Sequence, residues 1–261
     1  MKNNDLFIEE RRRKIIELVN KQQRVTVDQL VKELSFSPAT IRNDLKYLEN
    51  KELLRRTHGG AIPFKKREIN IGENLRAKTA KNQDKKIEIG KKAATLVDDN
   101  STIAIDAGST TFRFAKELVD KKNLTILTND LQIAVYLDNH TNFDIFFAGG
   151  KIEKKLNCCY GSSAINQIKD IYIDKCFMSA ESFDVKKGFF TPNLSESDWK
   201  INLLKVSDYK VMLIDSSKIG QTSFKRFAKL ENFNCMIMDK QVQDKIIEEI
   251  QLENPDIKVI V

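Results

Sequence analysis

Several short runs in the second half of this 261-residue sequence carry groups that attract anions. Gly108, Ser109, Thr110 and Thr111 precede a helical stretch, and Lys218 follows an Asp-Ser-Ser triplet. Glycine and hydroxyl residues before a helix present backbone N–H groups and hydroxyls to an anion, and the helix dipole strengthens the attraction. These runs therefore predict a phosphate-binding site. For any one run, the alternative is an ordinary turn whose Ser and Thr residues only cap a helix.

A second group of polar residues lies on the outer face of a predicted helix that Ser37 caps and Pro38 begins. This group consists of Thr40, Arg42, Asn43 and Lys46. An Arg side chain can bridge O6 and N7 of guanine, and an Asn side chain can bridge N6 and N7 of adenine. The sequence therefore predicts contacts with DNA bases, without deciding which residue reads a base. For Arg42 the alternative is a salt bridge, with Glu49 as one partner.

The elements that must position this face lie between residues 24 and 61. Apolar residues at Val27, Leu30, Val31 and Leu34 predict a short helix, and the stripe Ile41, Leu45 and Leu48 predicts that the next helix packs against it. Residues 9–20 predict a third helix, with residues 1–8 as a loose tail. A basic hairpin follows, where Arg55, Arg56 and His58 are expected to contact phosphates or the minor groove. These elements predict a winged helix-turn-helix, which places its second helix in the major groove.

The charge distribution supports a nucleic-acid partner for this part of the chain. Residues 1–68 contain 16 Lys and Arg against 10 Asp and Glu, a net charge of +6, and the remaining residues contain 28 against 27, a net charge of +1. A basic unit beside a nearly neutral one is typical of a nucleic-acid-binding domain. The alternative is a solvated lysine-rich surface, and charge alone does not separate the two.

Other features of the sequence exclude several classes of protein. The four cysteines form no C-x-x-C pair and the chain has only two histidines, so no metal site and no cofactor are predicted. The N-terminus lacks the apolar stretch of a signal peptide, and no apolar run reaches the ~20 residues that cross a bilayer. We therefore expect a soluble, cytoplasmic protein with no membrane partner.

From residue 84 onward, helical patterns alternate with short β-like runs. Strands are predicted at 102–105, 124–127, 143–147, 175–178, 210–214, 235–238 and 258–261, and helices include 84–97 and 241–251. This alternation predicts an α/β domain with a largely parallel sheet covered on both faces. Several strands end in small or polar residues, and ligands of open α/β sheets bind beyond the carboxyl ends of the strands.

The N-terminal motifs resemble those of the DeoR family of bacterial transcriptional repressors. The resemblance rests on the run from Ser37 to Leu45, which contains T-I-R-x-D-L, and on the H-G-G-A turn that starts at His58. Asn43 departs from the family, which commonly has a second Arg at this position. The operator sequence can therefore differ from those of other family members. The resemblance implies a double-stranded DNA operator as partner and a homo-oligomer, either a dimer or a tetramer.

The rest of the chain resembles the sensor domain of that family, which is similar in fold to ribose-5-phosphate isomerase. By this resemblance, the loops after the strands surround a phosphorylated sugar. The effector-binding residues that it implies, together with Thr111 from the run above, are Asp106, Gly108, Ser109, Thr110, Thr128, Asn129, Gly150 and Lys218. Residues 178–182 depart from the glycine-rich sequence that the family usually has there. This leaves open whether Glu181 faces the ligand.

Together these observations predict three segments. Residues 1–62 form a winged helix-turn-helix domain, residues 63–83 a linker, and residues 84–261 an α/β effector-binding domain. The expected function is a non-enzymatic DNA-binding regulator, a repressor of a carbohydrate-metabolism operon that a phosphorylated sugar releases or modulates. The alternatives are a sugar-phosphate isomerase with an accessory DNA-binding head and a nucleic-acid-binding protein without sequence preference.

Overall fold

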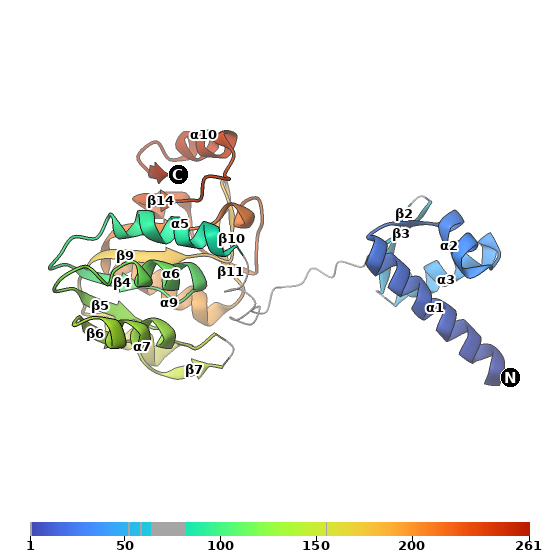
Figure 1. Cartoon of the computed structure of the whole chain (residues 1–261), viewed down its shortest axis with the longest axis horizontal. Coiled ribbons are helices and arrows are strands. Elements are labelled where there is room, and N and C mark those ends of the chain that lie inside the picture. The colour runs from blue at the N-terminus through green and yellow to red at the C-terminus, as the bar shows by residue number, and fades with distance from the viewer. Residues whose placement is uncertain (1, 52, 58, 64–81, 155) are drawn as a thin grey trace. The chain divides into compact units, whose positions relative to one another are not determined.

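The computed structural model describes residues 2–51, 53–57, 59–63, 82–154 and 156–261. The chain divides into two compact units, residues 1–68 and residues 69–261. Most of the predicted linker, 64–81, lies outside the described residues. The domain limits of 62 and 84 stay predictions. The two units, hereafter the N-terminal unit and the C-terminal unit, are described separately (Figure 1).

The N-terminal unit consists of three helices and a small antiparallel sheet. The helices are α1 (Lys2–Gln22), α2 (Val27–Leu34) and α3 (Pro38–Asn50), and the strands are β1 (Val25–Thr26), β2 (Leu54–Thr57) and β3 (Gly60–Pro63), in the order β1-β3-β2. The prediction of a loose tail over residues 1–8 was wrong, because α1 already begins at Lys2. The arginines at 11–13 therefore lie within the helix and not at its start.

Local chemistry explains where the helices of the N-terminal unit begin and end. Thr26 and Gln29 form a reciprocal capping box at the start of α2, and Ser35 ends that helix in the left-handed conformation. The hydroxyl of Ser37 accepts the N–H of Thr40 at 3.1 Å, and Pro38 occupies the first turn of α3. The predicted stripe of Ile41, Leu45 and Leu48 is fully buried in one apolar cluster with residues of α1, α2 and β3.

The wing depends on a glycine at its turn. A Cβ on Gly60 would lie 1.9 Å from the carbonyl oxygen of Val25, so only glycine lets β3 approach β1 this closely. This places the β2–β3 hairpin beside α1 and completes the winged helix-turn-helix that the sequence predicted.

The C-terminal unit is built on a seven-stranded parallel sheet. Its strands are β4 (Thr102–Ile105), β5 (Thr125–Thr128), β6 (Asp144–Phe147), β9 (Ile173–Ser179), β12 (Ser207–Leu213), β14 (Cys235–Ile237) and β15 (Lys258–Ile260). They lie in the order β15-β14-β12-β9-β4-β5-β6, and all neighbouring pairs are parallel. The parallel α/β fold class is therefore confirmed.

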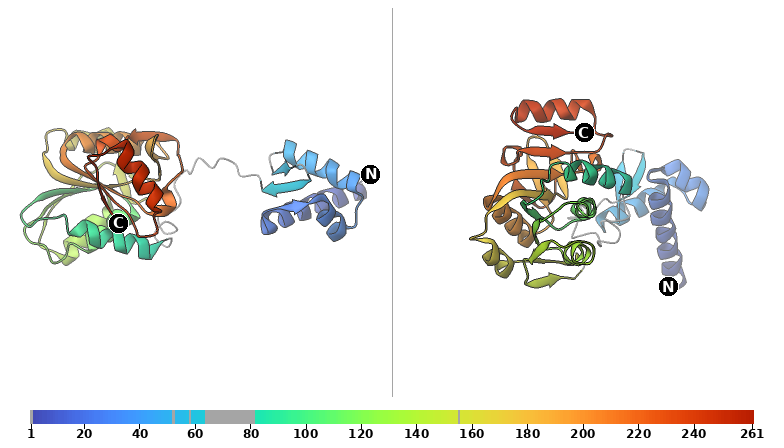
Figure 2. Two further views of the ribbon diagram at one scale, coloured as in Figure 1. Left: turned by 90° about the horizontal axis from the view of Figure 1, so that it is seen from above. Right: turned by 60° about the vertical axis from the view of Figure 1, so that its left-hand side comes forward.

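Helices cover both faces of this sheet, as the views in Figure 2 show. The helices α5 (Gln83–Ala94), α6 (Ser109–Lys116) and α7 (Leu131–His140) share one apolar cluster, and α8 (Ser162–Ile168), α9 (Leu194–Lys205) and α10 (Asp244–Glu253) share another. Successive residues of β4 alternate between the two, since Ile103 and Ile105 pack with the first cluster and Ala104 with the second.

Smaller elements that the sequence patterns did not predict are added to this sheet. β7 (Lys151–Glu153) and β8 (Cys158–Tyr160) form an antiparallel pair. A second antiparallel sheet consists of β10 (Ser182–Asp184), β11 (Gly188–Thr191) and β13 (Lys225–Ala228). Two short 3-10 turns, η1 (Ser216–Lys218) and η2 (Leu230–Asn232), follow β12 and β13.

Candidate functional site

The outer face of α3 presents the side chains that the sequence predicts for base contacts. Arg42, Asn43 and Lys46 are exposed, and Thr40 is half-buried. Among the described residues, no hydrogen bond or ion pair engages the side chains of Arg42, Asn43 or Lys46. Polar groups without protein partners at a helix surface are available to base edges and phosphates.

Other predicted DNA-binding residues have structural contacts of their own. The hydroxyls of Ser37 and Thr40 lie 2.8 Å apart at the start of α3, so both help to form the helix terminus. Arg55 and Arg56 lie exposed on β2, but the N–H of Arg56 donates to the carboxylate of Glu49 at 2.9 Å. His58 lies outside the described residues. Glu49, weighed as a partner for Arg42, is thus the partner of Arg56.

The predicted effector residues all follow adjacent strands at the carboxyl edge of the parallel sheet. Lys218 comes after β12, Asp106 after β4, and Gly150 after β6, with Thr128 at the end of β5. These four strands and β9, which lies between β12 and β4, are consecutive in the sheet. The topology therefore brings the predicted residues to one edge.

Four of the predicted effector residues are buried and already hydrogen-bonded. Asp106 accepts from Nε1 of Trp199 at 3.1 Å and from Nζ of Lys200. The hydroxyls of Thr111 and Thr128 donate to the carbonyls of Gly108 and Ile105 at 2.9 and 2.7 Å. The Asn129 amide bridges Ala107 N–H and the carbonyl of Cys159. These contacts favour a role in shaping the strand-end loops, and direct contact with a ligand stays a prediction for all four.

Solvent reaches only some of the predicted effector groups at this edge. The partly exposed ones are Gly108, Ser109 and Lys218, with Gly150 exposed farther along the edge, whereas Thr110 is buried. Gly108 has its position fixed by β9, because a Cβ there would lie 2.5 Å from the hydroxyl of Ser179.

Two carboxylates lie against these anion-attracting groups. Oδ2 of Asp130 accepts the Gly108 N–H at 3.3 Å, and Oε1 of Glu181 lies 3.5 Å from Nζ of Lys218. Burial is the main cause that raises the pKa of Asp130 from its ordinary value of 3.8 to about 6, and the charge of Asp106 adds to it. The sequence patterns did not assign Asp130 a role. The sequence left open whether Glu181 faces the ligand, and the structure shows that its carboxylate contacts Lys218.

Comparison with known proteins supplies the family. Residues 11–67 match the family model described as a DeoR-like helix-turn-helix domain, and residues 81–240 match the DeoR C terminal sensor domain. The chain is 34% identical over 254 residues to the HTH-type transcriptional regulator GolR of Listeria innocua, covering 97% of this chain and 99% of that protein. The chain belongs to the DeoR family. It is a DNA-binding transcriptional regulator, as the sequence resemblance implied.

Other DeoR-family relatives agree with this assignment. The HTH-type transcriptional repressor GlcR of Bacillus subtilis is 30% identical over 236 residues, covering 90% of each chain. Such relatives are named as regulators and repressors, which favours the regulator over the isomerase alternative. Ribose 5-phosphate isomerase A from Methanocaldococcus jannaschii has a partial structural likeness, with a TM-score of 0.40 and 17% identity over 53% of this chain and 55% of that chain. That likeness carries no argument about function.

In this DeoR-family chain, the residues that the sequence missed are those with distant partners. Lys200 is buried on α9, where it contacts Asp106, the carbonyl of Ser179 at 2.9 Å and Glu196 at 3.6 Å. Burial alone would lower the pKa of Lys200, but the charges of Asp106 and Glu196 outweigh it, so the pKa is raised. No local sequence pattern marks a lysine whose partner lies 94 positions away.

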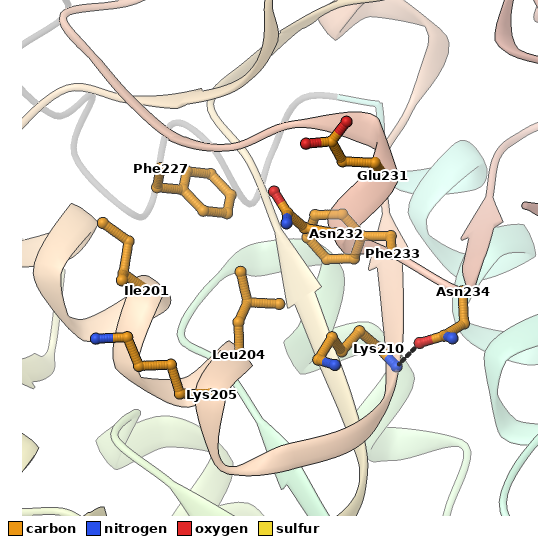
Figure 3. A pocket seen from close by; sticks show the side chains of 9 residues that line it. All are labelled: Ile201, Leu204, Lys205, Lys210, Phe227, Glu231, Asn232, Phe233 and Asn234. Atoms are coloured by element: carbon orange, nitrogen blue, oxygen red, sulfur yellow. Dashed lines mark hydrogen bonds between the residues drawn. The ribbon is translucent and has the colours of Figure 1, made fainter. Parts of the chain in front are cut away.

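Two pockets of similar size lie at different places in the C-terminal unit. One, of about 420 Å³, is lined by residues on both sides of Lys218, including Ser216, Ser217 and Ile219, and by Lys85. The other, of about 400 Å³, lies between α9 and the η2 segment, with Leu204, Phe227 and Phe233 among its lining residues (Figure 3). Only the first lies at the edge that carries the predicted effector residues.

Within the described part of the chain, no helix is long and apolar enough to cross a membrane. The same residues contain no group of three or more His, Cys, Asp or Glu side chains that could hold a metal ion. All four cysteines are free and buried.

Proposed function

We propose that this DeoR-family regulator represses a carbohydrate-metabolism operon and that a phosphorylated sugar, bound at the carboxyl edge of the sheet, modulates its affinity for operator DNA. The observation that carries the effector part is that anion-attracting groups follow strands of the parallel sheet that lie close together in its order, and therefore share one edge. Gly108 and Ser109 stand at the N-terminus of α6, and Lys218 follows β12, two strands away. A helix terminus and an ammonium group are suited to a phosphate group.

A pocket beyond β12 and β14, at the same edge of the sheet, is consistent with a ligand larger than phosphate alone. Its volume of about 420 Å³ lies in the range of small-molecule sites. The side-chain amides of Gln241 and Gln243 on its lining suit the hydroxyl groups of a sugar, whereas the hydroxyls of Ser216 and Ser217 already bond to Asp239 and Asp215. The predicted effector set remains Asp106, Gly108, Ser109, Thr110, Thr111, Thr128, Asn129, Gly150 and Lys218.

On the DNA side, α3 is proposed to enter the major groove. Arg42, Asn43 and Lys46 would meet base edges, and Arg55 and Arg56 on the wing would meet phosphates. A homo-oligomer would place two such units on repeated half-sites. The effector switches this assembly only if it binds the DNA-competent and the released states with different affinity.

A thermal-shift screen of the full chain against phosphorylated sugars and their unphosphorylated counterparts tests the effector class. A ligand that binds only the native state raises the unfolding temperature, and at 100 times its Kd it adds about 2.7 kcal/mol. We expect a shift with one or more phosphorylated sugars and none with the matched free sugars. Equal shifts with both forms, or no shift with any phosphorylated sugar, would overturn the effector proposal and leave the DNA-binding assignment intact.

A further inference from the structure

Asp44 is the one charged residue of α3 that points into the N-terminal unit. Its side chain is 3% exposed and accepts Nε of Arg11 on one carboxylate oxygen at 2.5 Å and Nε of Arg12 on the other at 2.8 Å. Both arginines come from α1, more than 30 positions earlier in the chain. One carboxylate therefore joins the recognition helix to α1 by two charge-assisted hydrogen bonds.

Aromatic side chains hold the two guanidinium groups in place. The guanidinium carbon of Arg11 lies 4.5 Å from the ring centre of Phe36, in the turn before α3. That of Arg12 lies 3.6 Å from the ring centre of Tyr47, on α3 itself. Stacking on aromatic rings suits the flat guanidinium group. The arginines, the two rings and Asp44 form a single cluster, hereafter the arginine clamp.

The clamp supplies something that the apolar packing of α3 does not. Burial of Ile41, Leu45 and Leu48 turns one broad side of α3 inward, but hydrophobic burial is not directional and defines the rotation of the helix about its axis only loosely. Two hydrogen bonds to opposite oxygens of one carboxylate set the rotation of the helix about its axis. Arg42 and Asn43 are the two residues directly before Asp44, so this rotation determines where their side chains point.

We propose that Arg11 and Arg12 are positioning residues for DNA recognition, acting through Asp44, and that they do not supply phosphate contacts. Their side chains are only 11% and 24% exposed, against 78% for Arg13 next to them on α1. The basic run at 11–13 thus divides into two structural arginines and one solvent-exposed arginine. The rival assignment is that the run grips the DNA backbone as a unit.

Salt dependence separates the two assignments. Each neutralised phosphate contributes about 0.9 to the slope of log affinity against log salt concentration, so losing one phosphate contact lowers the slope by about one. The test uses the full chain, a duplex that the wild-type protein enriches from a randomised pool, and a duplex of random sequence. Affinity for both is measured over a salt series for Arg12→Gln, for Asp44→Asn and for the control Arg13→Gln.

We expect Arg12→Gln and Asp44→Asn to lower affinity for the selected duplex about tenfold or more, with the salt slope and the affinity for random DNA close to those of the wild type. The double variant that combines Arg12→Gln with Asp44→Asn should lose no more affinity for the selected duplex than Asp44→Asn alone, because both substitutions break the same cluster. Circular dichroism and thermal unfolding identify the temperature at which each variant begins to unfold, and binding is measured below that temperature.

Equal loss on selected and random duplexes, with a slope lower by about one for Arg12→Gln but not for Asp44→Asn, would show a phosphate contact and overturn the proposal. Losses that multiply in the double variant would also overturn it. If Asp44→Asn does not fold, Arg12→Gln still decides the question, because Arg11 keeps its bond to Asp44 in that variant.

Discussion

Glu181 and Lys218 form an ion pair at the carboxyl edge of the sheet, with Oε1 and Nζ 3.5 Å apart. Both side chains are partly buried, at 10% and 27% exposure. A phosphate that binds to Lys218 must therefore compete with a carboxylate already in place. The N–H of Gly108 has a similar competitor in Asp130. Both anion-attracting groups are thus paired with carboxylates of the protein itself.

Replacing Glu181 by Gln should strengthen binding of the phosphorylated sugar. The substitution keeps the size of the side chain but removes the charge that competes for Lys218, and an ion pair of this kind is worth up to about 1 kcal/mol. We expect a two- to fivefold lower Kd by calorimetry, about the factor that this energy corresponds to. Glu153→Gln, an exposed acid on β7, serves as control. Weaker binding in Glu181→Gln would show that Glu181 holds the ligand instead.

Replacing Arg42 by Ala should weaken binding to the selected operator at fixed salt. A bidentate contact with a base is worth about 1–3 kcal/mol, and its loss relaxes specificity at that position. Arg55→Ala is the matched control, since a lost phosphate contact weakens binding to all sequences alike. Unchanged affinity of the Arg42 variant for the selected duplex would remove Arg42 from the recognition surface.

The raised pKa of Asp130 predicts a pH-dependent contribution to stability. Burial raises this pKa from 3.8 to about 6. Between these two pH values, Asp130 keeps its proton in the folded state and releases it in the unfolded state. The contribution is fully present below pH 4 and is lost as the pH rises through 6. The free energy of unfolding of Asp130→Asn minus that of wild type should therefore rise with pH.

The change between pH 4 and pH 7 should be on the order of 3 kcal/mol, the free energy that corresponds to this pKa change. Urea unfolding at several pH values measures it. Asp120→Asn reports the effect of removing an exposed carboxylate. A difference between the Asp130 variant and wild type that stays flat across this range would contradict the assignment of the proton to Asp130.

The buried pair of Asp106 and Lys200 should behave as a structural unit. Removing one partner leaves a buried charge uncompensated, which costs about 3–5 kcal/mol. Lys200→Met alone and Asp106→Asn alone should thus lower the urea midpoint strongly, and the double variant should be more stable than the sum of the two losses predicts. Additive losses would mean that the two side chains stabilise the fold independently.

What the sequence predicted well depends on residues close together in the chain. Ser37 and Pro38 mark the start of α3 by local chemistry, and the strand 102–105 was predicted with the bounds that the structure has. The carboxyl edge followed from strand order, since every strand of a parallel sheet ends on the same side. These inferences need only periodicity, caps and topology.

What it missed depends on tertiary contacts. Nothing near Asp44 shows that its partners are Arg11 and Arg12, and nothing near Lys200 indicates Asp106. The pairing of β11 with β13 joins segments that are separated by α9 and β12, so no local alternation of residues could reveal it. The division of the strand-end residues into buried and partly exposed groups likewise became visible only when the loops were packed together.

Release of operator DNA by a phosphorylated sugar tests the proposed function most directly. The affinity of the full chain for its selected duplex is measured with and without the sugar phosphate that gives the largest thermal shift, for wild type, for Lys218→Ala and for the control Lys205→Ala. The sugar phosphate should change operator affinity at least tenfold in wild type and in Lys205→Ala, which is about 1.4 kcal/mol of coupling. Lys218→Ala should bind the operator normally and respond little. An unchanged operator affinity in wild type, or a full response in Lys218→Ala, would contradict the proposed function.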